Sequence, residues 1–585
     1  MADAAGATPR GSTPDRRASA SSSASEPVPS LNRLSSMEAG SAAAKSAAAW
    51  QELAKRFAHG DARWARSTTG VNVVLFLLFL GFSIATAVQN LRRAAPLLAL
   101  NALVLLRWGV LRLSAASGWT GTDLARPLHR LAERWSWLFH CLLAVIFLAV
   151  AACWIAIDVV RDPYRLVPVS GLLLLIGGTY ATSRHRADVR WRPVVSGIAL
   201  QLLMGVFVMR TWLGNEAFRW MGDQVNAFLD HTEMGCRFVF GDEYATVYFA
   251  FKVLPIIIYF GSVTAIGFYL GWLQWIFARV AWAVQLVMGT SATESFIGAA
   301  NIFIGMTEAP LLVKPFLKDL TQSELHAVMT CGFATVSGGV LAAYVSFGVS
   351  AQHLIAASVM SCPAALACAK LSYPETEEPR ISVDNAEDVA NCAECMGDHS
   401  VIEAAANGAT NAVSLVANIA ACLIAFLSIW SFVDSAVWWV GDMVGIEGLS
   451  VEMLCSYAFW PLAFVIGVPA VDCRHVARLL GLKTFINEFV AYRHLGDLVD
   501  AGELSRRAEV IATYALCGFS NIGSIGIMMG GMGALTPERR QDVAQMVVRA
   551  MIFGSTACLM TACVAGMLYG DSSARGVPDL IASKP

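Results

Sequence analysis

The sequence predicts an all-α polytopic membrane protein, because of its composition, the length of its apolar stretches and the places where those stretches are interrupted. Of its 585 residues, 56% are hydrophobic and only 15% are charged. Many apolar stretches reach about 20 residues, which is enough for an α-helix to cross a bilayer. The net charge of −2 gives no electrostatic reason to expect nucleic acid as a partner. The lipid bilayer is therefore the expected surrounding of most of the chain.

Residues 1–66 are expected to form a tail outside the bilayer. Most of this tail is rich in Ser, Ala, Pro and Gly, a composition that predicts disorder. In its last third, Trp50, Leu53 and Phe57 recur at helical spacing among basic residues. This basic amphipathic segment is consistent with a helix lying on an anionic leaflet and equally with a solvated linker.

Residues 67–192 are predicted to form additional transmembrane helices that precede the rest of the protein. If the N-terminus is cytoplasmic, the loops on the inner side carry more arginine than the loops on the outer side, as the positive-inside rule requires. A further segment, 216–230, mixes aromatic and acidic residues and predicts an interfacial helix on the outer side. The first apolar spans fall at about 71–91, 95–112, 136–159, 166–183, 193–213 and 244–272.

A polar stretch then interrupts an apolar run at 288–317. It contains Asn301, Thr307 and Glu308, followed directly by Pro310. A carboxylate at hydrocarbon depth costs about 2.5–3.5 kcal/mol on insertion scales, so its presence there indicates a function. Because glycine and proline also divide the run, we expect a re-entrant hairpin rather than a straight span.

The second half of the chain repeats this organisation. The sequence CGFATVSG at 331–338 is echoed by CGFSNIGS at 517–524, and the second copy also follows a polar-tipped apolar segment, Asn487-Glu-Phe489. Interrupted helices at matching places in two halves predict a transporter with internal repeats and a site near the bilayer midplane. The alternative is that Cys-Gly-Phe recurs by chance in a chain rich in glycine and phenylalanine.

Five longer motifs resemble the concentrative nucleoside transporter family: NIFIGMTEAPLL, SELHAVMTCGFATVSGGVLAAYVSFGV, SVMSCPAALACAKLSYPE, FINEFVAY and CGFSNIGSIGI. The resemblance runs from about Pro193 to Leu568, and the extra spans before it resemble vertebrate-type sodium/nucleoside cotransporters. It implies a homotrimer, with scaffold helices and a transport domain of two re-entrant hairpins and two discontinuous helices in inverted repeats. Residues 193–569 would form this core, and residues 570–585 a C-terminal tail.

The resemblance also implies a substrate site. Vicinal ribose hydroxyls need a carboxylate acceptor and amide partners, because charge-assisted hydrogen bonds are the strong ones. An alternative for Asn521 and Ser524 is that they satisfy backbone groups freed by a helix break. By similarity, the nucleobase would be contacted by Gly305, Met306, Thr307, Glu308 and Val340, and the ribose by Glu488, Asn521 and Ser524.

The cotransported ion implied by the resemblance is sodium, held by side-chain oxygens of Asn301 and Thr335 and backbone carbonyls of Ile304 and Val336. Oxygen ligands of this kind are what a hard cation prefers. Proton coupling through Glu308 or Glu488 is the alternative, since some members of the family use it.

One departure from the family pattern concerns the substrate. Many relatives have Gln where this chain has Met306, and Gly-Met combined with Thr335-Val336 resembles the purine-preferring vertebrate members. A thioether in place of an amide removes hydrogen-bonding capacity beside the base, so the pocket would select by shape. We therefore expect sodium-coupled, concentrative uptake of adenosine, inosine, guanosine and uridine at the plasma membrane, by alternating access.

Two other functional classes use similar residues. Glu308 and Glu488 could form the acid/base pair of a membrane-embedded hydrolase, and broken helices also line channels. The sequence contains no nucleophile elbow, H-E-x-x-H or phosphate-binding motif to accompany the carboxylates. A transporter that is not an enzyme is therefore the expected class.

Overall fold

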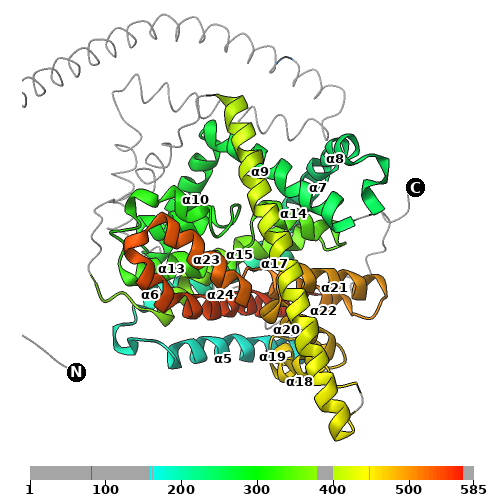
Figure 1. Cartoon of the computed structure of the whole chain (residues 1–585). Coiled ribbons are helices and arrows are strands. Elements are labelled where there is room, and N and C mark those ends of the chain that lie inside the picture. The colour runs from blue at the N-terminus through cyan, green and yellow to red at the C-terminus, as the bar shows by residue number, and fades with distance from the viewer. Residues whose placement is uncertain are drawn as a thin grey trace, which may run out of the picture. The chain divides into compact units, whose positions relative to one another are not determined.

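The computed structural model describes residues 159–160, 162–246, 248–377, 400–446 and 448–570, together with Gly81. From residue 159 onward, these residues belong to one structural unit, His140–Pro585. Every regular element in the described ranges is helical, which confirms the all-α prediction (Figure 1). The tail at 1–66, the spans predicted before residue 159 and the C-terminal residues 571–585 lie outside the described part of the chain.

Seven helices among the described residues are long and apolar enough to cross a membrane, as expected for a polytopic membrane protein. One of the seven, Gln322–Ser346, is composed of two shorter helices separated by a break. The other six contain α5 (Val167–Ala181), α6 (Trp191–Arg210), α9 (Leu254–Tyr269), α15 (Ala351–Ser372), α17 (Val401–Val444) and α24 (Arg540–Leu568).

Several helix boundaries differ from the sequence prediction. The expected span at 244–272 is divided into η4 (Asp242–Thr246), η5 (Tyr248–Val253) and α9, and α10 (Trp272–Met288) forms where no separate helix was predicted. Gly271, which separates α9 from α10, and Gly289, which ends α10, both adopt left-handed backbone conformations. The apolar stretch 451–470 is similarly divided into α18 (Val451–Ala458) and α19 (Trp460–Val465).

The segment 216–230, predicted to lie at the membrane interface, falls within the amphipathic helix α7 (Trp212–Asp230), and a second amphipathic helix, α8 (Thr232–Phe240), follows it. Large apolar side chains are exposed on both, including Trp212 at 80% and Phe238 at 91%. Both helices also carry acidic and basic residues, so they have the mixed character of interfacial helices rather than of spans.

The first interrupted block contains a helix, a polar turn, and then a helix broken in the middle. Its elements are α11 (Ala292–Ala300), α12 (Ala309–Leu312), η6 (Lys314–Phe316), α13 (Gln322–Ala334) and α14 (Gly338–Ser346). Thr321 and Glu324 form a capping box at the start of α13. The helix stops at Thr335, whose backbone is extended, and resumes at Gly338.

The second block has the same order of elements. They are α20 (Cys473–Phe485), α21 (Glu488–Asp500), α22 (Arg506–Leu516) and α23 (Ile522–Leu535). Three of these helices begin at a side chain that accepts a backbone N–H, namely Asn487, Ser505 and Asn521. The two blocks marked by the repeated Cys-Gly-Phe motif therefore have the same order of elements. Each consists of a helix, a polar turn, a second helix and a broken helix.

The two helix breaks cross each other against α24. The backbone N–H of Phe519 donates to the Thr335 carbonyl at 3.3 Å. The Cys558 thiol of α24 lies 3.0 Å from the Cys517 carbonyl and 3.5 Å from the Ala334 carbonyl. A Cβ atom on Gly518 would lie only 2.5 Å from that thiol and 2.8 Å from the Phe333 carbonyl. Glycine at this position is what allows the crossing.

Helix α17 packs along α9, and the two run side by side in Figure 1. Their contact is close where Gly261 of α9 meets Gly408 of α17, because a Cβ on Gly408 would lie 2.6 Å from the Gly261 carbonyl oxygen. Small residues at such a crossing are typical of helix pairs in membranes. Most of α17 is otherwise exposed: its buried residues are Ala404, Ala412, Leu423 and Gly441.

We predict that Gly518→Ala destabilises the protein by about 1–3 kcal/mol, because the added methyl group overpacks the crossing. The apparent unfolding temperature of detergent-solubilised protein would measure this loss. Gly526→Ala on α23 is the control, since a Cβ there meets nothing within 4 Å and alanine favours a helix. Equal stability of the two variants would contradict the close crossing.

Candidate functional site

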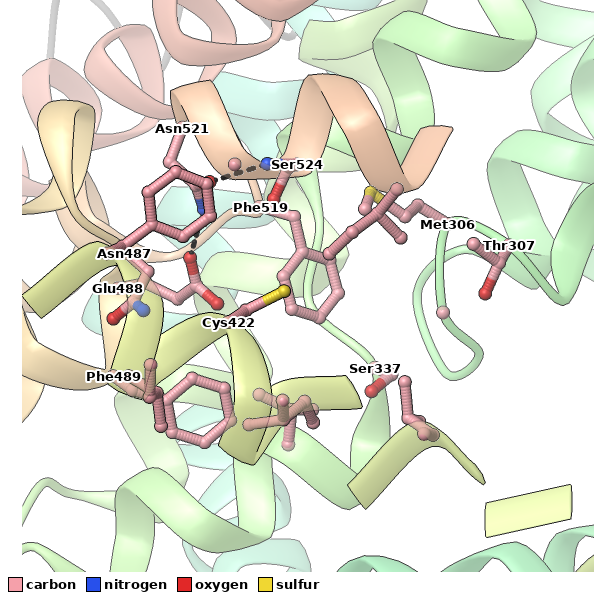
Figure 2. A pocket seen from close by; sticks show the side chains of 18 of the residues that line it. Met306, Thr307, Ser337, Cys422, Asn487, Glu488, Phe489, Phe519, Asn521 and Ser524 are labelled. Carbon is pink, nitrogen blue, oxygen red and sulfur yellow. Dashed lines mark hydrogen bonds between the residues drawn. The ribbon is translucent and has the colours of Figure 1, made fainter. Parts of the chain in front are cut away.

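A cavity lies where the two blocks meet the middle of α17. Its empty volume is about 730 Å³, including the part that is open to the surroundings. In Figure 2, Glu488 and Asn521 lie on one side, Met306 and Thr307 lie on a loop across from them, and Cys422 and Phe519 lie between. The cavity is therefore bounded by the turn between α11 and α12, by both helix breaks, by the start of α21 and by the middle of α17.

The most polar side of the cavity is formed by Glu488, Asn521 and Ser524, each only 3% exposed. The Asn521 side-chain amide donates to the Glu488 carboxylate at 2.7 Å, and the Asn521 side-chain oxygen accepts the Ser524 backbone N–H at 2.7 Å (Figure 2). Asn521 thus satisfies a backbone group freed by the break and also orients the carboxylate. The two interpretations of this residue, as a local cap and as a site residue, are compatible.

The opposite side is the turn between α11 and α12. The Gly305 carbonyl accepts the backbone N–H groups of Glu308 and Ala309, at 3.1 and 3.0 Å, which closes the turn. Met306 is buried against Gly332 of α13, where a Cβ would lie 2.9 Å from the Met306 Cβ. The turn therefore presents Thr307 and Glu308 to the cavity from a tightly packed base.

The structure brings all of the residues expected to contact substrate to this one cavity. Five come from the first block and three from the second, although the two groups lie far apart in the sequence. In chain order these lining residues are Gly305, Met306, Thr307, Glu308, Val340, Glu488, Asn521 and Ser524. Their contact with a substrate remains a prediction.

None of the four residues expected to hold sodium is among the lining residues of the cavity, and all four are buried. Within the described residues, the Asn301 side chain has no hydrogen-bond partner on either its oxygen or its nitrogen. A buried amide without partners is costly, so this side chain suits coordination of a cation. The Thr335 hydroxyl donates to the Cys331 carbonyl at 2.9 Å and keeps oxygen lone pairs available. Ile304 and Val336 lie on the turn and in the break, respectively.

Sequence reasoning missed the wall that α17 contributes. The α17 residues that line the cavity lie at position 415 and then four, seven, eight and eleven residues later, so they share one face of the helix. This spacing is the signal in the sequence that could have identified the wall. The residues are Leu415, Ile419, Cys422, Leu423 and Phe426. Phe519, at the second break, was also missed as a lining residue.

Comparison with protein families gives three matches that together cover most of the described chain. The model described as "Na+ dependent nucleoside transporter N-terminus" matches residues 170–243, and the corresponding C-terminus model matches 353–566. Between them, a model described as "Nucleoside recognition" matches 250–351. The broken helices and both sides of the cavity fall within these matches.

Individual proteins are similar over much of their length. Solute carrier family 28 member 3 of Rattus norvegicus is 47% identical over 511 residues, covering 85% of this chain and 72% of the relative. Sodium/nucleoside cotransporter 2 of Rattus norvegicus is 42% identical over 509 residues, covering 85% of this chain and 76% of the relative. The solved structure of CNTnw in an inward-facing substrate-bound state is 34% identical, with a TM-score of 0.65, and covers 69% of this chain and 98% of that one.

These relatives are transporters and not enzymes, and the names of the matching family models and of the cotransporters specify sodium as the coupled ion. The level of identity and the coverage of both chains are sufficient to assign the family from sequence, and the helical fold agrees with it. The chain belongs to the sodium-dependent nucleoside transporter family, solute carrier family 28.

Proposed function

We propose that this protein takes up purine nucleosides and uridine together with sodium across the plasma membrane, by alternating access. The observation that carries the proposal is the cavity in which a buried, oriented carboxylate, Glu488, faces the turn at Met306–Glu308. A nucleoside has a diol at one end and a flat, partly apolar base at the other. The cavity has Glu488 at one end and, at the other, the apolar side chains of Met306 and Val340 beside the polar Thr307 and Glu308.

The ribose end is argued from hydrogen bonding. Asn521 donates to one carboxylate oxygen of Glu488, which leaves the other oxygen able to accept from ribose hydroxyls. Hydrogen bonds to an ionised acceptor in a buried site are about twice as strong as neutral ones. The same Asn521 contact fixes the carboxylate rotamer, so little ordering is required when the substrate arrives.

The base end is argued from shape. Met306, Val340 and the α17 face contribute mainly apolar surface, and Phe519 adds an aromatic ring to the wall. Methionine is flexible and polarisable, and it can adapt to the larger purine ring system. A pocket without an amide at position 306 loses a polar contact that could favour pyrimidines. This supports adenosine, inosine and guanosine as preferred substrates, with uridine also accepted.

Sodium coupling is argued from the contact between the turn and the first break. The Gly338 backbone N–H donates to the Phe303 carbonyl at 2.9 Å, so the turn and the start of α14 are joined. A cation held by Asn301, Ile304, Thr335 and Val336 would tighten this junction and order the turn that carries Thr307 and Glu308. Sodium and nucleoside would then raise each other's affinity by linkage.

Alternating access is supported by the division of the packing. Helices α9 and α17 pack on each other and would form the scaffold, while the two re-entrant hairpins and broken helices would move as the transport domain in residues 193–569. The exposed apolar length of α17 suits a homotrimer interface. CNTnw has been solved in inward-facing, outward-facing and intermediate states. We also propose that residues 67–192 contribute additional transmembrane helices and that the N-terminus is cytoplasmic.

We expect cells that produce this protein to accumulate radiolabelled inosine and uridine in sodium medium, with little thymidine. Replacing sodium by choline at fixed pH should reduce uptake to the level of control cells. Met306→Gln should raise thymidine uptake relative to inosine by roughly fivefold, the size expected for one restored hydrogen bond. Uptake that follows external pH without sodium would assign proton coupling instead, and equal thymidine and inosine uptake would contradict the purine preference.

Substitutions at the two polar centres should differ in their kinetic effect. Asn301→Ala should raise the sodium concentration for half-maximal uptake by about tenfold, since one ligand to the cation is removed. Glu488→Ala should lower nucleoside uptake by about 100-fold at every sodium concentration, because the ribose acceptor is lost. Sodium-activation curves measured on protein matched for surface amount would test both. Unchanged sodium activation in Asn301→Ala would refute the assigned ion site.

Cys422 allows a test of the cavity that does not depend on loss of function by mutation. It is half-buried in the cavity wall, whereas the other cysteines in the described ranges are buried. A small methanethiosulfonate reagent should therefore inhibit uptake, and excess inosine should slow that inhibition several-fold by occupying the cavity. Cys422→Ser should be resistant, and Cys455→Ser, which removes a buried thiol elsewhere, should remain sensitive. Inhibition that is unaffected by inosine would argue against nucleoside binding there.

A further inference from the structure

Lys483 places a buried positive charge at the second helix break, outside the lining of the nucleoside cavity. It lies in the last turn of α20, the first helix of the second block, and it is only 2% exposed. Its Nζ atom donates to the Ala515 carbonyl at 2.8 Å. Ala515 belongs to the last turn of α22, directly before the break that begins at Cys517. The ammonium group of one helix therefore lies against the end of another.

The end of α22 carries carbonyl groups that no following helical turn can satisfy. Besides the Lys483 ammonium, the Tyr492 hydroxyl of α21 donates to the Thr513 carbonyl at 2.8 Å. The Cys517 backbone N–H donates to the Tyr514 carbonyl at 3.4 Å. The negative end of the helix macrodipole also lies here, and a cation in this position stabilises it. Both α20 and α21 are thus bonded to the end of the same broken helix.

The charge of Lys483 is balanced within this cluster. A buried ammonium is costly unless hydrogen bonds and opposite charges compensate it. Lys483 interacts electrostatically with the Glu488 carboxylate at the start of α21, and that carboxylate accepts from Asn521 at 2.7 Å. A nearby positive charge favours the ionised form of a carboxylate, which is the stronger hydrogen-bond acceptor. Lys483 is therefore placed to act on the residue that faces the cavity.

The first break contains no equivalent ammonium group among the described residues. Asn301 directly follows α11, the first helix of the first block, so it occupies a place similar to that of Lys483 in the second block. Its side-chain amide has no hydrogen-bond partner within the described ranges. Glu308, the acidic residue of the first turn, forms no ion pair with a described residue. The two blocks thus share an order of elements but differ in their charge.

We propose that Lys483 is a tethered cation at the second helix break, where it takes the place that cotransported sodium takes at the first break. It bonds α20 to the end of α22 without an ion from solution, and it positions Glu488 for the ribose hydroxyls. The second half of the site is preassembled, whereas the first half becomes ordered when an ion binds. The positioning of Glu488 rests on the proposed function, but the bond between α20 and α22 does not.

Hydrogen exchange of the purified full-length protein, measured by mass spectrometry without nucleoside, tests the structural role. Lys483→Met should speed exchange at 484–492 by about tenfold, with or without sodium, because a hydrogen bond from a charged donor is lost. Lys483→Gln should have nearly the same effect, since its amide retains a donor but carries no charge. Arg478→Met is the matched control, because it removes a cation from the same helix that pairs with Glu452 outside the cavity. Wild-type exchange in Lys483→Gln would exclude a role for the charge.

The same measurement on the wild type tests whether the two breaks differ in their need for an ion. Sodium should slow exchange several-fold at 301–308, where the proposed ion site lies, and should leave exchange at 484–492 unchanged. Sodium-dependent protection of equal size at 484–492 would show that the second block also needs an ion from solution, and it would overturn the proposal.

The positioning role is tested by equilibrium binding of inosine and of 2′,3′-dideoxyinosine, which lacks the ribose diol, at saturating sodium. Lys483→Gln should weaken inosine binding by about tenfold and dideoxyinosine binding by less than about twofold, because only inosine bonds to Glu488 through its diol. Equal losses for the two ligands would mean that Lys483 supports the fold alone. If the wild type binds no inosine, the proposed function fails, and the exchange measurement still decides whether Lys483 holds α22.

Discussion

The structure depends on how the backbone groups of two broken helices are satisfied inside an apolar environment. A break at membrane depth frees N–H and C=O groups that have no water to bond to. Here the Phe519 N–H donates to the Thr335 carbonyl, so each break supplies a partner for the other. The Ser524 N–H is capped by the Asn521 side chain. The crossing of the breaks therefore meets a structural requirement of the membrane environment, independently of what the adjoining cavity binds.

The substrate cavity follows from this crossing. Once the breaks meet, the side chains at their edges face a common space, and Glu488 is held there by the same Asn521 that caps α23. Because Asn521 donates to Glu488 while it caps α23, the buried Glu488 carboxylate has a hydrogen-bond partner, which helps to explain why it is tolerated. At the proposed ion site, the buried Asn301 amide has no hydrogen-bond partner among the described residues.

Helix α14 lines two of the cavities among the described residues. Its first turn contributes Val340 to the nucleoside cavity, and its last turn contributes Ser346 to a second cavity, which lies beside α8 and is also lined by Asp230. A helix of this length is rigid, so a displacement at one end is transmitted to the other.

The sequence by itself determined the helical membrane class, the positions of both helix breaks and, through its resemblance to a family, the eight residues that the structure gathers in one cavity. Glycine, proline and polar residues in an apolar run are strong local signals, because each has a large energetic effect on a membrane helix. The bounds of α10, the wall formed by Leu415 and Phe426 on α17 and the cavity around Asp230 were decided only by the tertiary structure. An apolar helix in a membrane protein has no polar contrast to mark its inner face, and residues from six separate elements meet only after the chain has folded.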